Sequence, residues 1–303
     1  HLPEITPEQS RDYDMVFSLT PRWTAESLKG NERLLGVHRF GVGYDMVDVA
    51  ALTEAGVALY ITRNAVRRPV ASAIITLLLA LSTKLFLKDK LIREGRWSER
   101  AQHHGIGLVG KTLGSIGVGN IGQEVFKLAA PLDMHHIAHD PFVRPEHVSD
   151  VIVEMTDMDT VLREADFLTV CCPLNENTYH LIGESELRKM KPTSFLINMS
   201  RGPVVDEDVL IRALQEGWIQ GAGLDVFEQE PIAPDNPLLA MDNVILAPHS
   251  LAWLDQTFTG MWDEILAQMD EVRTGNTAAG LVNNEVLPSP IYQAKLDRFL
   301  QET

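Results

Sequence analysis

The sequence predicts an α/β protein in which a doubly wound parallel sheet is inserted into a second, smaller α/β domain. From residue 105 onward, short apolar runs alternate regularly with helical patterns, which is typical of parallel strands covered by helices on both faces. The same strand–helix–strand alternation occurs once more in residues 33–62. We therefore predict an inner domain at 75–271 and an outer domain built from 1–74 and 272–303. The cleft between two such domains is the expected place for a ligand.

The individual elements follow from hydrophobic periodicity and from the glycines and prolines that end them. Strands are predicted at 34–37, 57–60, 112–117, 135–138, 167–171, 194–198, 221–226 and 243–247. Helices are predicted at 47–54, 70–94, 121–130, 158–164, 184–190, 207–216 and 254–273. The longest apolar stretch, 69–81, contains Ser72 and Thr76 and is short for a bilayer span, so we expect it to form a buried helix.

Composition excludes several classes of partner. The 303 residues carry a formal net charge of −16, which repels nucleic-acid backbones and anionic lipid headgroups. The two cysteines, Cys171 and Cys172, are adjacent and are expected to be reduced thiols, which favours a cytoplasmic location. The first residues, HLPEITPEQSRD, do not read as a secretory signal. Because there is no initiator Met, we expect a segment to precede His1.

A glycine pattern lies between the strand predicted at 112–117 and the helix that follows. Gly117, Gly119 and Gly122, with Asn120 and Ile121 between them, fit the spacing G-x-G-x-x-G. In this context the first glycine permits a tight turn, the second lets backbone approach a pyrophosphate, and the third allows close helix–sheet packing. The pattern therefore predicts a dinucleotide-binding Rossmann domain.

Asp140 ends the next predicted strand, where a carboxylate accepts hydrogen bonds from the ribose hydroxyls and repels a 2′-phosphate. This position favours NAD over NADP. A turn or helix-cap role is the alternative, because Pro141 follows directly, and Arg144 keeps the use of NADP open.

Three segments at the ends of the late strands carry polar residues suited to catalysis, and with other stretches they form a recognisable pattern. The chain resembles the D-isomer-specific 2-hydroxyacid dehydrogenase family, which includes glycerate/hydroxypyruvate, D-lactate and 3-phosphoglycerate dehydrogenases. The matching stretches are GVGYDMVD (41–48), GKTLGSIGVGNIG (110–122), ADFLTVCCPL (165–174), INMSRGPVVDEDVL (197–210), GAGLDVFEQEP (221–231) and NVILAPH (243–249).

The resemblance implies an NAD-dependent enzyme that moves a hydride between nicotinamide and a small, anionic D-2-hydroxy or 2-oxo acid. Arg201 matches the arginine that binds the substrate carboxylate and carbonyl in two-pronged fashion. His249 matches the acid/base, and Glu230 the carboxylate that orients its imidazole. Taken singly, each could be a surface, turn or strand-end side chain.

The resemblance also implies a Rossmann domain inserted into a smaller flavodoxin-like domain, and a homodimer formed through the helix after Pro69. It assigns further binding roles. Backbone N–H groups should bind the substrate at Val42 and Gly43, and the cofactor should contact Pro173, Met199, Ser200, Arg201 and Asp225. A cap or turn role is the alternative for Asp225.

Two positions depart from the family pattern and leave the substrate open. Ser250 stands where many members have isoleucine, and Ser72 where a glutamate is common. Arg39, Arg67 and Arg68 are candidates for holding a second anionic or polyhydroxy group, although the last two could equally be solvated residues before a helix. No metal site is predicted, since the histidine pairs at 103–104 and 135–136 lack the spacing of zinc ligands.

Two other functions remain to be weighed. The same family contains corepressors that use this fold as an NADH-sensing interaction scaffold, and some of them retain the Arg–Glu–His set. Formate dehydrogenase shares the fold but needs no carboxylate-paired acid/base, so Glu230 disfavours it.

Overall fold

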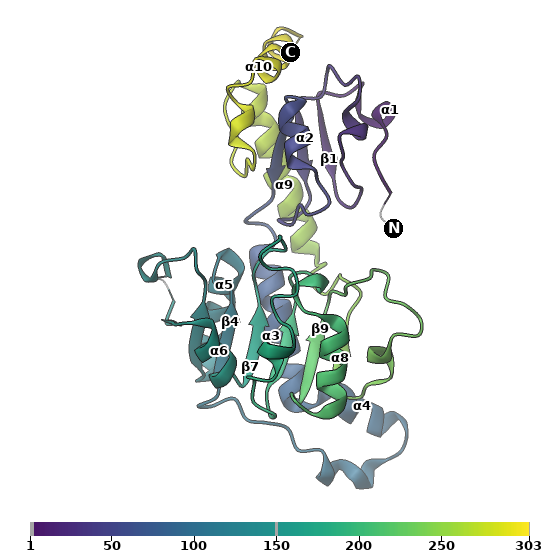
Figure 1. The fold of residues 1–303 in the computed structure, drawn as a ribbon, viewed down its shortest axis with the longest axis vertical. Coiled ribbons are helices and arrows are strands. Elements are labelled where there is room, and N and C mark those ends of the chain that lie inside the picture. Colours follow the sequence, from purple (N-terminus) through teal and green to yellow (C-terminus); the bar gives the residue numbers. More distant parts are fainter. Residues whose placement is uncertain (1–2, 149–150, 303) are drawn as a thin grey trace. The chain divides into compact units, whose positions relative to one another are not determined.

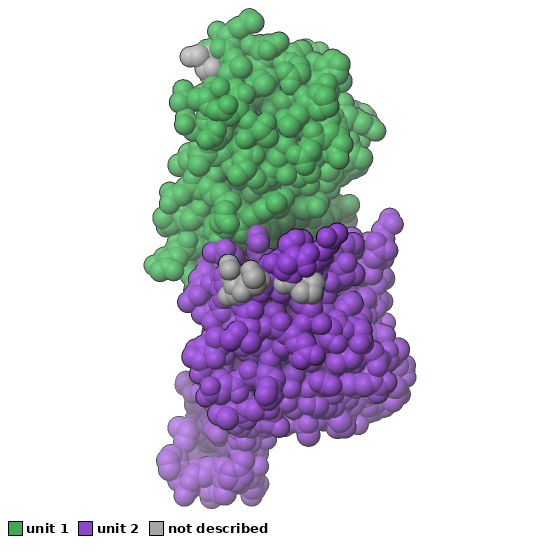
Figure 2. Space-filling view, turned by 90° about the vertical axis from the view of Figure 1, so that its left-hand side faces the viewer, with its two compact units in different colours: residues 1–66, 253–303 green, residues 67–252 purple. Residues whose placement is uncertain are grey.

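The computed structural model describes residues 3–148 and 151–302, so His1 lies outside the described residues. The chain divides into two compact units, residues 67–252 and residues 1–66 with 253–303, which are coloured separately in Figure 2. The larger unit is an insertion in the chain of the smaller one.

Both boundaries differ from the predicted ones at 74/75 and 271/272. The inserted unit already begins with helix α3 (Arg67–Thr83), while helix α9 (Asp255–Arg273) belongs to the smaller unit. The second difference has a local cause, because Gln268 and Glu264 on α9 bond to the last residue of the third strand of the smaller unit and to the segment that follows it. Glu264 accepts the backbone N–H of Ala65 at 3.1 Å, and the Gln268 amide donates to the Ile61 carbonyl at 3.0 Å.

The larger unit has a Rossmann-like α/β architecture. Its seven described strands are all parallel, in the order β10-β9-β8-β7-β4-β5-β6. The strands are β4 (Thr112–Ile116), β5 (His135–His139), β6 (Glu154–Met155), β7 (Phe167–Val170), β8 (Phe195–Asn198), β9 (Gly221–Leu224) and β10 (Val244–Leu246). The strand order reverses between β4 and β7, the place where open α/β sheets bind ligands outside the carboxyl ends of their strands.

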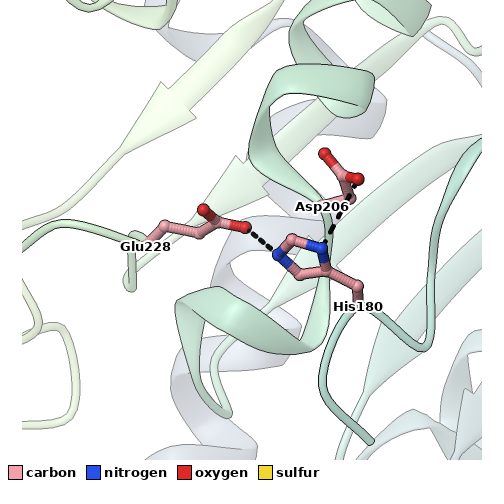
Figure 3. Close-up of side chains that lie close together, drawn as sticks. All are labelled: His180, Asp206 and Glu228. Carbon is pink, nitrogen blue, oxygen red and sulfur yellow. Dashed lines mark hydrogen bonds and ion pairs between the residues drawn. The ribbon is translucent and has the colours of Figure 1, made fainter.

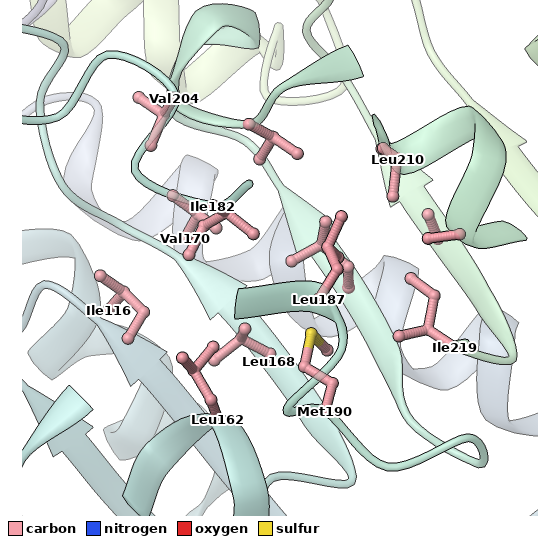
Figure 4. Close-up of a cluster of buried hydrophobic side chains, with 14 of the residues drawn as sticks. Ile116, Leu162, Leu168, Val170, Ile182, Leu187, Met190, Val204, Leu210 and Ile219 are labelled. Atoms are coloured by element: carbon pink, nitrogen blue, oxygen red, sulfur yellow. The ribbon is translucent and has the colours of Figure 1, made fainter. Parts of the chain in front are cut away.

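Helices cover both faces of this sheet (Figure 1). They are α3, α4 (Leu85–Arg93), α5 (Asn120–Ala129), α6 (Met158–Glu164), α7 (Glu184–Leu187) and α8 (Glu207–Glu216), with short 3-10 turns at 97–102, 130–132, 145–148, 202–204 and 237–240. One core packs α3 and α5 against the sheet. The other, seen in Figure 4, packs α6, α7 and α8 against its opposite face. Strands buried on both faces explain why their sequences are continuous apolar runs.

The single helix predicted for 70–94 is wrong: the segment forms α3 and α4, bent by 59°. Lys84 between them has a left-handed backbone with φ 55°, which ends α3. The carbonyl of Ser82 accepts the N–H of Ile106 at 2.7 Å, so the chain returning to β4 binds the end of α3. No single helix in the described chain is long and apolar enough to cross a membrane, although this bent pair has the required length and composition.

The smaller unit contains a parallel sheet with fewer described strands than the five of flavodoxin-like domains. Its three described strands are β1 (Met15–Ser18), β2 (Gly36–Arg39) and β3 (Ala58–Ile61), in that order. The helices are α1 (Pro7–Ser10), α2 (Val49–Glu54), α9 and α10 (Pro290–Glu302), with 3-10 turns at 26–28 and 284–286. Sequence periodicity missed β1, β6, α1 and α10.

Cys171 and Cys172 are both free and follow β7 directly. Burial raises the pKa of both thiols, that of Cys172 to about 12. Neither cysteine therefore has the character of a reactive thiolate.

Candidate active site

The glycine loop joins β4 to α5 and is shaped by three different steric requirements. Gly117 has φ 92°, and a Cβ there would lie 2.8 Å from the backbone of Cys171. A Cβ on Gly122 would lie 2.7 Å from the Gly117 carbonyl oxygen. Around Gly119, which caps α5, nothing lies within 4 Å of a built Cβ. The loop is therefore tight where it packs on protein and open at the N-terminus of α5.

Asp140, at the end of β5, ties this loop to the next strand. Its Oδ2 accepts the N–H of Val118 at 2.9 Å, and its Oδ1 accepts the N–H of Phe142 at 2.9 Å. The carboxylate thus has the turn role considered as the alternative, and it lies beside the glycine loop, where the ribose role is predicted. Arg144 is exposed and pairs with Glu146 at 3.8 Å.

Asn198, the buried last residue of β8, shapes the loop that carries Arg201. Its side-chain amide donates to the Arg201 carbonyl at 2.9 Å, and its Oδ1 accepts the N–H and hydroxyl of Ser200 at 3.0 and 2.9 Å. Met199 lies in the same turn. Sequence analysis gave Asn198 no role of its own, although a polar residue ending a buried strand is a signal for one.

Gly202 brings the Arg201 loop directly against the next catalytic segment. A Cβ at this position would overlap the carbonyl group of Phe227 and crowd the nitrogen of Glu228. The two loops therefore contact each other backbone to backbone, and only glycine fits between them.

Glu230 and His249 form a hydrogen-bonded pair, with Nδ1 of the imidazole 2.7 Å from Oε2 of the carboxylate. The other oxygen, Oε1, accepts the N–H of Phe227 at 3.1 Å. Burial raises the pKa of the Glu230 carboxyl, but the hydrogen bond and charge of His249 outweigh it and hold that pKa below its ordinary value. The charge of Arg201 lowers the pKa of Glu230 in the same direction, as a smaller effect.

Asp225, buried just after β9, fixes the turn that follows His249. It accepts the N–H of Ser250 at 3.0 Å and that of Leu251 at 3.2 Å. Burial raises its pKa, although these two N–H groups oppose the rise. His249 has φ 52°, an uncommon conformation for a residue with a side chain, and this turn holds it there. The structure thus shows a turn role for Asp225, and its contact with the cofactor stays a prediction.

The loop of Val42 and Gly43 lies in the smaller unit and is held by Arg39. The Arg39 guanidinium is buried and donates to the Gly43 carbonyl at 2.7 Å and to the carbonyl of Leu19. These backbone contacts give Arg39 a structural role, and the anion-binding role considered for it stays a prediction. Pro173, in the larger unit, follows β7, and its carbonyl accepts the hydroxyl of Thr178 at 2.6 Å.

Arg67 and Arg68 are partly exposed, and both face one carboxylate of the larger unit. Arg68 pairs with the buried carboxylate of Glu124 on α5 at 2.8 Å, and Arg67 approaches it to 3.6 Å. The two arginines thereby connect the first turn of α3 to the helix that follows the glycine loop.

His180, Asp206 and Glu228 form a second cluster of titratable side chains, shown in Figure 3. Nε2 of His180 lies 2.5 Å from Glu228 Oε1, and Nδ1 lies 3.5 Å from Asp206 Oδ2. Sequence analysis missed this cluster. Asp206 is recognisable as a helix cap, but nothing in the local pattern connects His180 to residues 26 and 48 positions further on.

Comparison with known proteins adds to this geometry. A model of the D-isomer specific 2-hydroxyacid dehydrogenase NAD binding domain matches residues 75–250. A glyoxylate reductase of Korarchaeum cryptofilum is 39% identical over 289 residues, which cover 94% of this chain and 87% of that protein.

Two crystal structures have the same fold. D-lactate dehydrogenase of Aquifex aeolicus, complexed with NAD and lactic acid, matches with a TM-score of 0.84 and 26% identity over 94% of this chain and 90% of its own. An NADPH-dependent glyoxylate/hydroxypyruvate reductase of Sinorhizobium meliloti, in complex with NADP and malonate, matches with a TM-score of 0.81 and 29% identity over 91% and 85%. The chain described here belongs to the D-isomer specific 2-hydroxyacid dehydrogenase family and is an oxidoreductase with an NAD-binding domain.

Proposed function

We propose that this enzyme reduces a small 2-oxo acid of the glyoxylate or hydroxypyruvate class to the D-2-hydroxy acid, with NADH as the reductant. The observation that carries the proposal is the Glu230–His249 pair at 2.7 Å, with the charge of Arg201 acting on the same carboxylate. The names of its relatives, glyoxylate reductase and glyoxylate/hydroxypyruvate reductase, support the substrate class.

The residues present fit a dinucleotide. The open surface at Gly119, at the N-terminus of α5, is the space that a pyrophosphate needs to approach backbone N–H groups. Gly117, Asn120, Ile121 and Gly122 would complete this cradle, with Pro173, Met199, Ser200 and Asp225 lining the rest of the cofactor site. When bound, the nicotinamide supplies the hydride.

The three catalytic residues each have a distinct part. Arg201 binds the carboxylate and polarises the carbonyl, so negative charge that develops on the carbonyl oxygen is stabilised. His249 donates a proton to that oxygen from its Nε2, because its Nδ1 faces Glu230. Glu230 fixes the orientation of the imidazole and stabilises its protonated form. Val42 and Gly43 contribute backbone N–H groups to the substrate carboxylate.

NAD is proposed over NADP because Asp140 places a carboxylate beside the glycine loop, where it repels a 2′-phosphate. We further propose a homodimer that uses α3 and its flanks. The exposed apolar side chains of Leu79, Leu85 and Phe86 support an interface there. The two adjacent free cysteines support a cytoplasmic location.

The test is NADH oxidation by the purified enzyme with a panel of 2-oxo acids, with NADPH measured in parallel. We expect turnover with at least one small member, and we expect His249→Gln to lower kcat by about a hundredfold to ten-thousandfold while the Kd for NADH is unchanged. NADH binding without turnover on the whole panel would contradict the proposal. If NADH then altered binding to a protein partner, the corepressor-like alternative would be supported.

A further inference from the structure

Three loops of the larger unit meet at His180, and two of them carry proposed catalytic residues. The backbone N–H of His180 donates to the Pro203 carbonyl at 2.8 Å, next to the Arg201–Gly202 turn. Its side chain reaches Glu228, two residues before Glu230 in the chain. His180 therefore joins the Arg201 loop through its backbone and the Glu230 loop through its side chain; Figure 3 shows the side chain between Glu228 and Asp206.

Glu228 is held from a second side by the first turn of α8. Its backbone N–H donates to the Glu207 carboxylate at 3.0 Å, and its own carboxylate accepts the Glu207 N–H at 3.3 Å. These reciprocal bonds leave the Phe227–Glu228 peptide little freedom. The N–H of Phe227, in the peptide just before, holds Oε1 of Glu230, so the anchoring of Glu228 reaches that carboxylate through Phe227.

The backbone of His180 is itself in an uncommon conformation. Its φ is 51°, in the left-handed region, and its ring stacks on that of Tyr179 with centroids 4.0 Å apart. Such a conformation persists where the surroundings over-determine it, and such positions concentrate at functional sites.

The ligand types in this cluster also suit a metal ion, but the arrangement favours a bridge. The two carboxylates lie at opposite nitrogens of one imidazole, Glu228 at Nε2 and Asp206 at Nδ1. In addition, Oδ1 of Asp206 accepts the N–H of Val209 as the cap of α8. An imidazole between two carboxylates connects the elements that carry them, whereas a chelate needs its donor atoms to converge on one point.

We propose that His180 and Glu228 are positioning residues for catalysis: they hold the Arg201 loop and the Glu230 loop in the register that the Glu230–His249 pair requires. Neither residue touches the reacting atoms in this account. The inference rests on the proposed function, because the register matters only if Glu230 and His249 carry the proton transfer.

The test compares His180→Asn, Glu228→Ala and Glu228→Gln with the wild-type enzyme. Asparagine tolerates the left-handed backbone but is too short to reach Glu228, whereas Glu228→Gln keeps an acceptor oxygen in place. We expect His180→Asn and Glu228→Ala to lower kcat by about tenfold to a hundredfold, the cost of a small misplacement of catalytic groups. The Kd for NADH should change less than kcat, because the glycine loop lies on other strands, although Met199 and Ser200 of the Arg201 loop also border the proposed cofactor site. Glu228→Gln should recover most of the lost kcat.

The pH profile gives a readout that a purely structural role would not move. A looser Glu230 stabilises the protonated imidazole less, so the fall of the reductive kcat/KM at high pH should begin at a lower pH in His180→Asn and Glu228→Ala. Glu184→Gln is the matched control. It breaks the pairing of an exposed carboxylate with Arg188 and Arg212 in the same region without touching either loop, and it should behave as wild type.

Unchanged kcat and pH profile in folded His180→Asn and Glu228→Ala would overturn the inference. The inference would also be overturned if Glu184→Gln lost kcat to the same extent, or if kcat fell only in proportion to a weaker binding of NADH. If His180→Asn does not fold, the two Glu228 variants decide alone, since that side chain is about one-third exposed, at 32%. Failure of the wild-type enzyme to turn over any 2-oxo acid would instead count against the proposed function.

Discussion

The glycine loop and the catalytic loops lie at the carboxyl ends of strands in one sheet, yet they are built in opposite ways. The glycine loop is contiguous and depends on missing side chains: Gly117 and Gly122 pack tightly, and Gly119 leaves space. The catalytic loops depend on side-chain hydrogen bonds between distant segments, such as Glu230 to His249. A site for a large, invariant cofactor group can thus be encoded locally, whereas a site for proton transfer needs several strands to be folded first.

The largest effect on stability and activity is expected at Gly202, the glycine on which the contact between the two catalytic loops depends. Gly202→Ala places a Cβ inside the backbone of Phe227 and Glu228, so one of the two catalytic loops must move. We expect the free energy of unfolding, measured in urea, to fall by about 1–3 kcal/mol or more, the usual cost of overpacking. We expect kcat/KM to fall by about a hundredfold or more. Wild-type stability and activity in this variant would contradict the close contact of the loops.

Gly119→Ala is the matched control in the glycine loop. Because nothing lies within 4 Å of the new Cβ, its stability should remain within about 0.5 kcal/mol of wild type. The methyl group instead occupies the space proposed for the pyrophosphate, so the Kd for NADH should rise. A loss of stability without a change in NADH affinity would contradict the claim that Gly119 leaves space for the cofactor and is not needed for packing.

The difference between the locally encoded glycine loop and the long-range contacts of the catalytic loops also explains which features the sequence could predict. The parallel sheet, helices α6 and α8 and the glycine loop follow from local periodicity and spacing, and the residues of the Glu230–His249 pair followed from motif resemblance. The break at Lys84 was missed because it depends on a tertiary contact, the bond from Ile106 to Ser82. The link from His180 to Glu228 was missed for the same reason, since it joins segments with no shared pattern.

A smaller effect is expected at Asp140, whose side chain bonds to the glycine loop and is also proposed to select the cofactor. Asp140→Asn removes the negative charge and keeps one acceptor oxygen for the bond from the Phe142 N–H. We expect the preference for NADH over NADPH, measured as the ratio of kcat/KM values, to fall about tenfold, or about 1.4 kcal/mol. Glu184→Gln, which leaves both Asp140 and the Arg144–Glu146 pair intact, is the control and should keep the wild-type ratio. An unchanged ratio in Asp140→Asn would show that the carboxylate only shapes the turn.

The most direct test of the account is the pH dependence of 2-oxo acid reduction in wild type and in Glu230→Gln. The pKa of Glu230 lies below its ordinary value, so this group stabilises the folded enzyme above the ordinary carboxyl range and loses that contribution as pH falls through the lowered pKa. At neutral pH the carboxylate is therefore charged, and it lies 2.7 Å from the imidazole of His249. We predict that in Glu230→Gln the high-pH fall of kcat/KM begins about one pH unit lower, with NADH affinity unchanged. An identical profile in the two proteins would contradict the claim that Glu230 and His249 act as one catalytic pair.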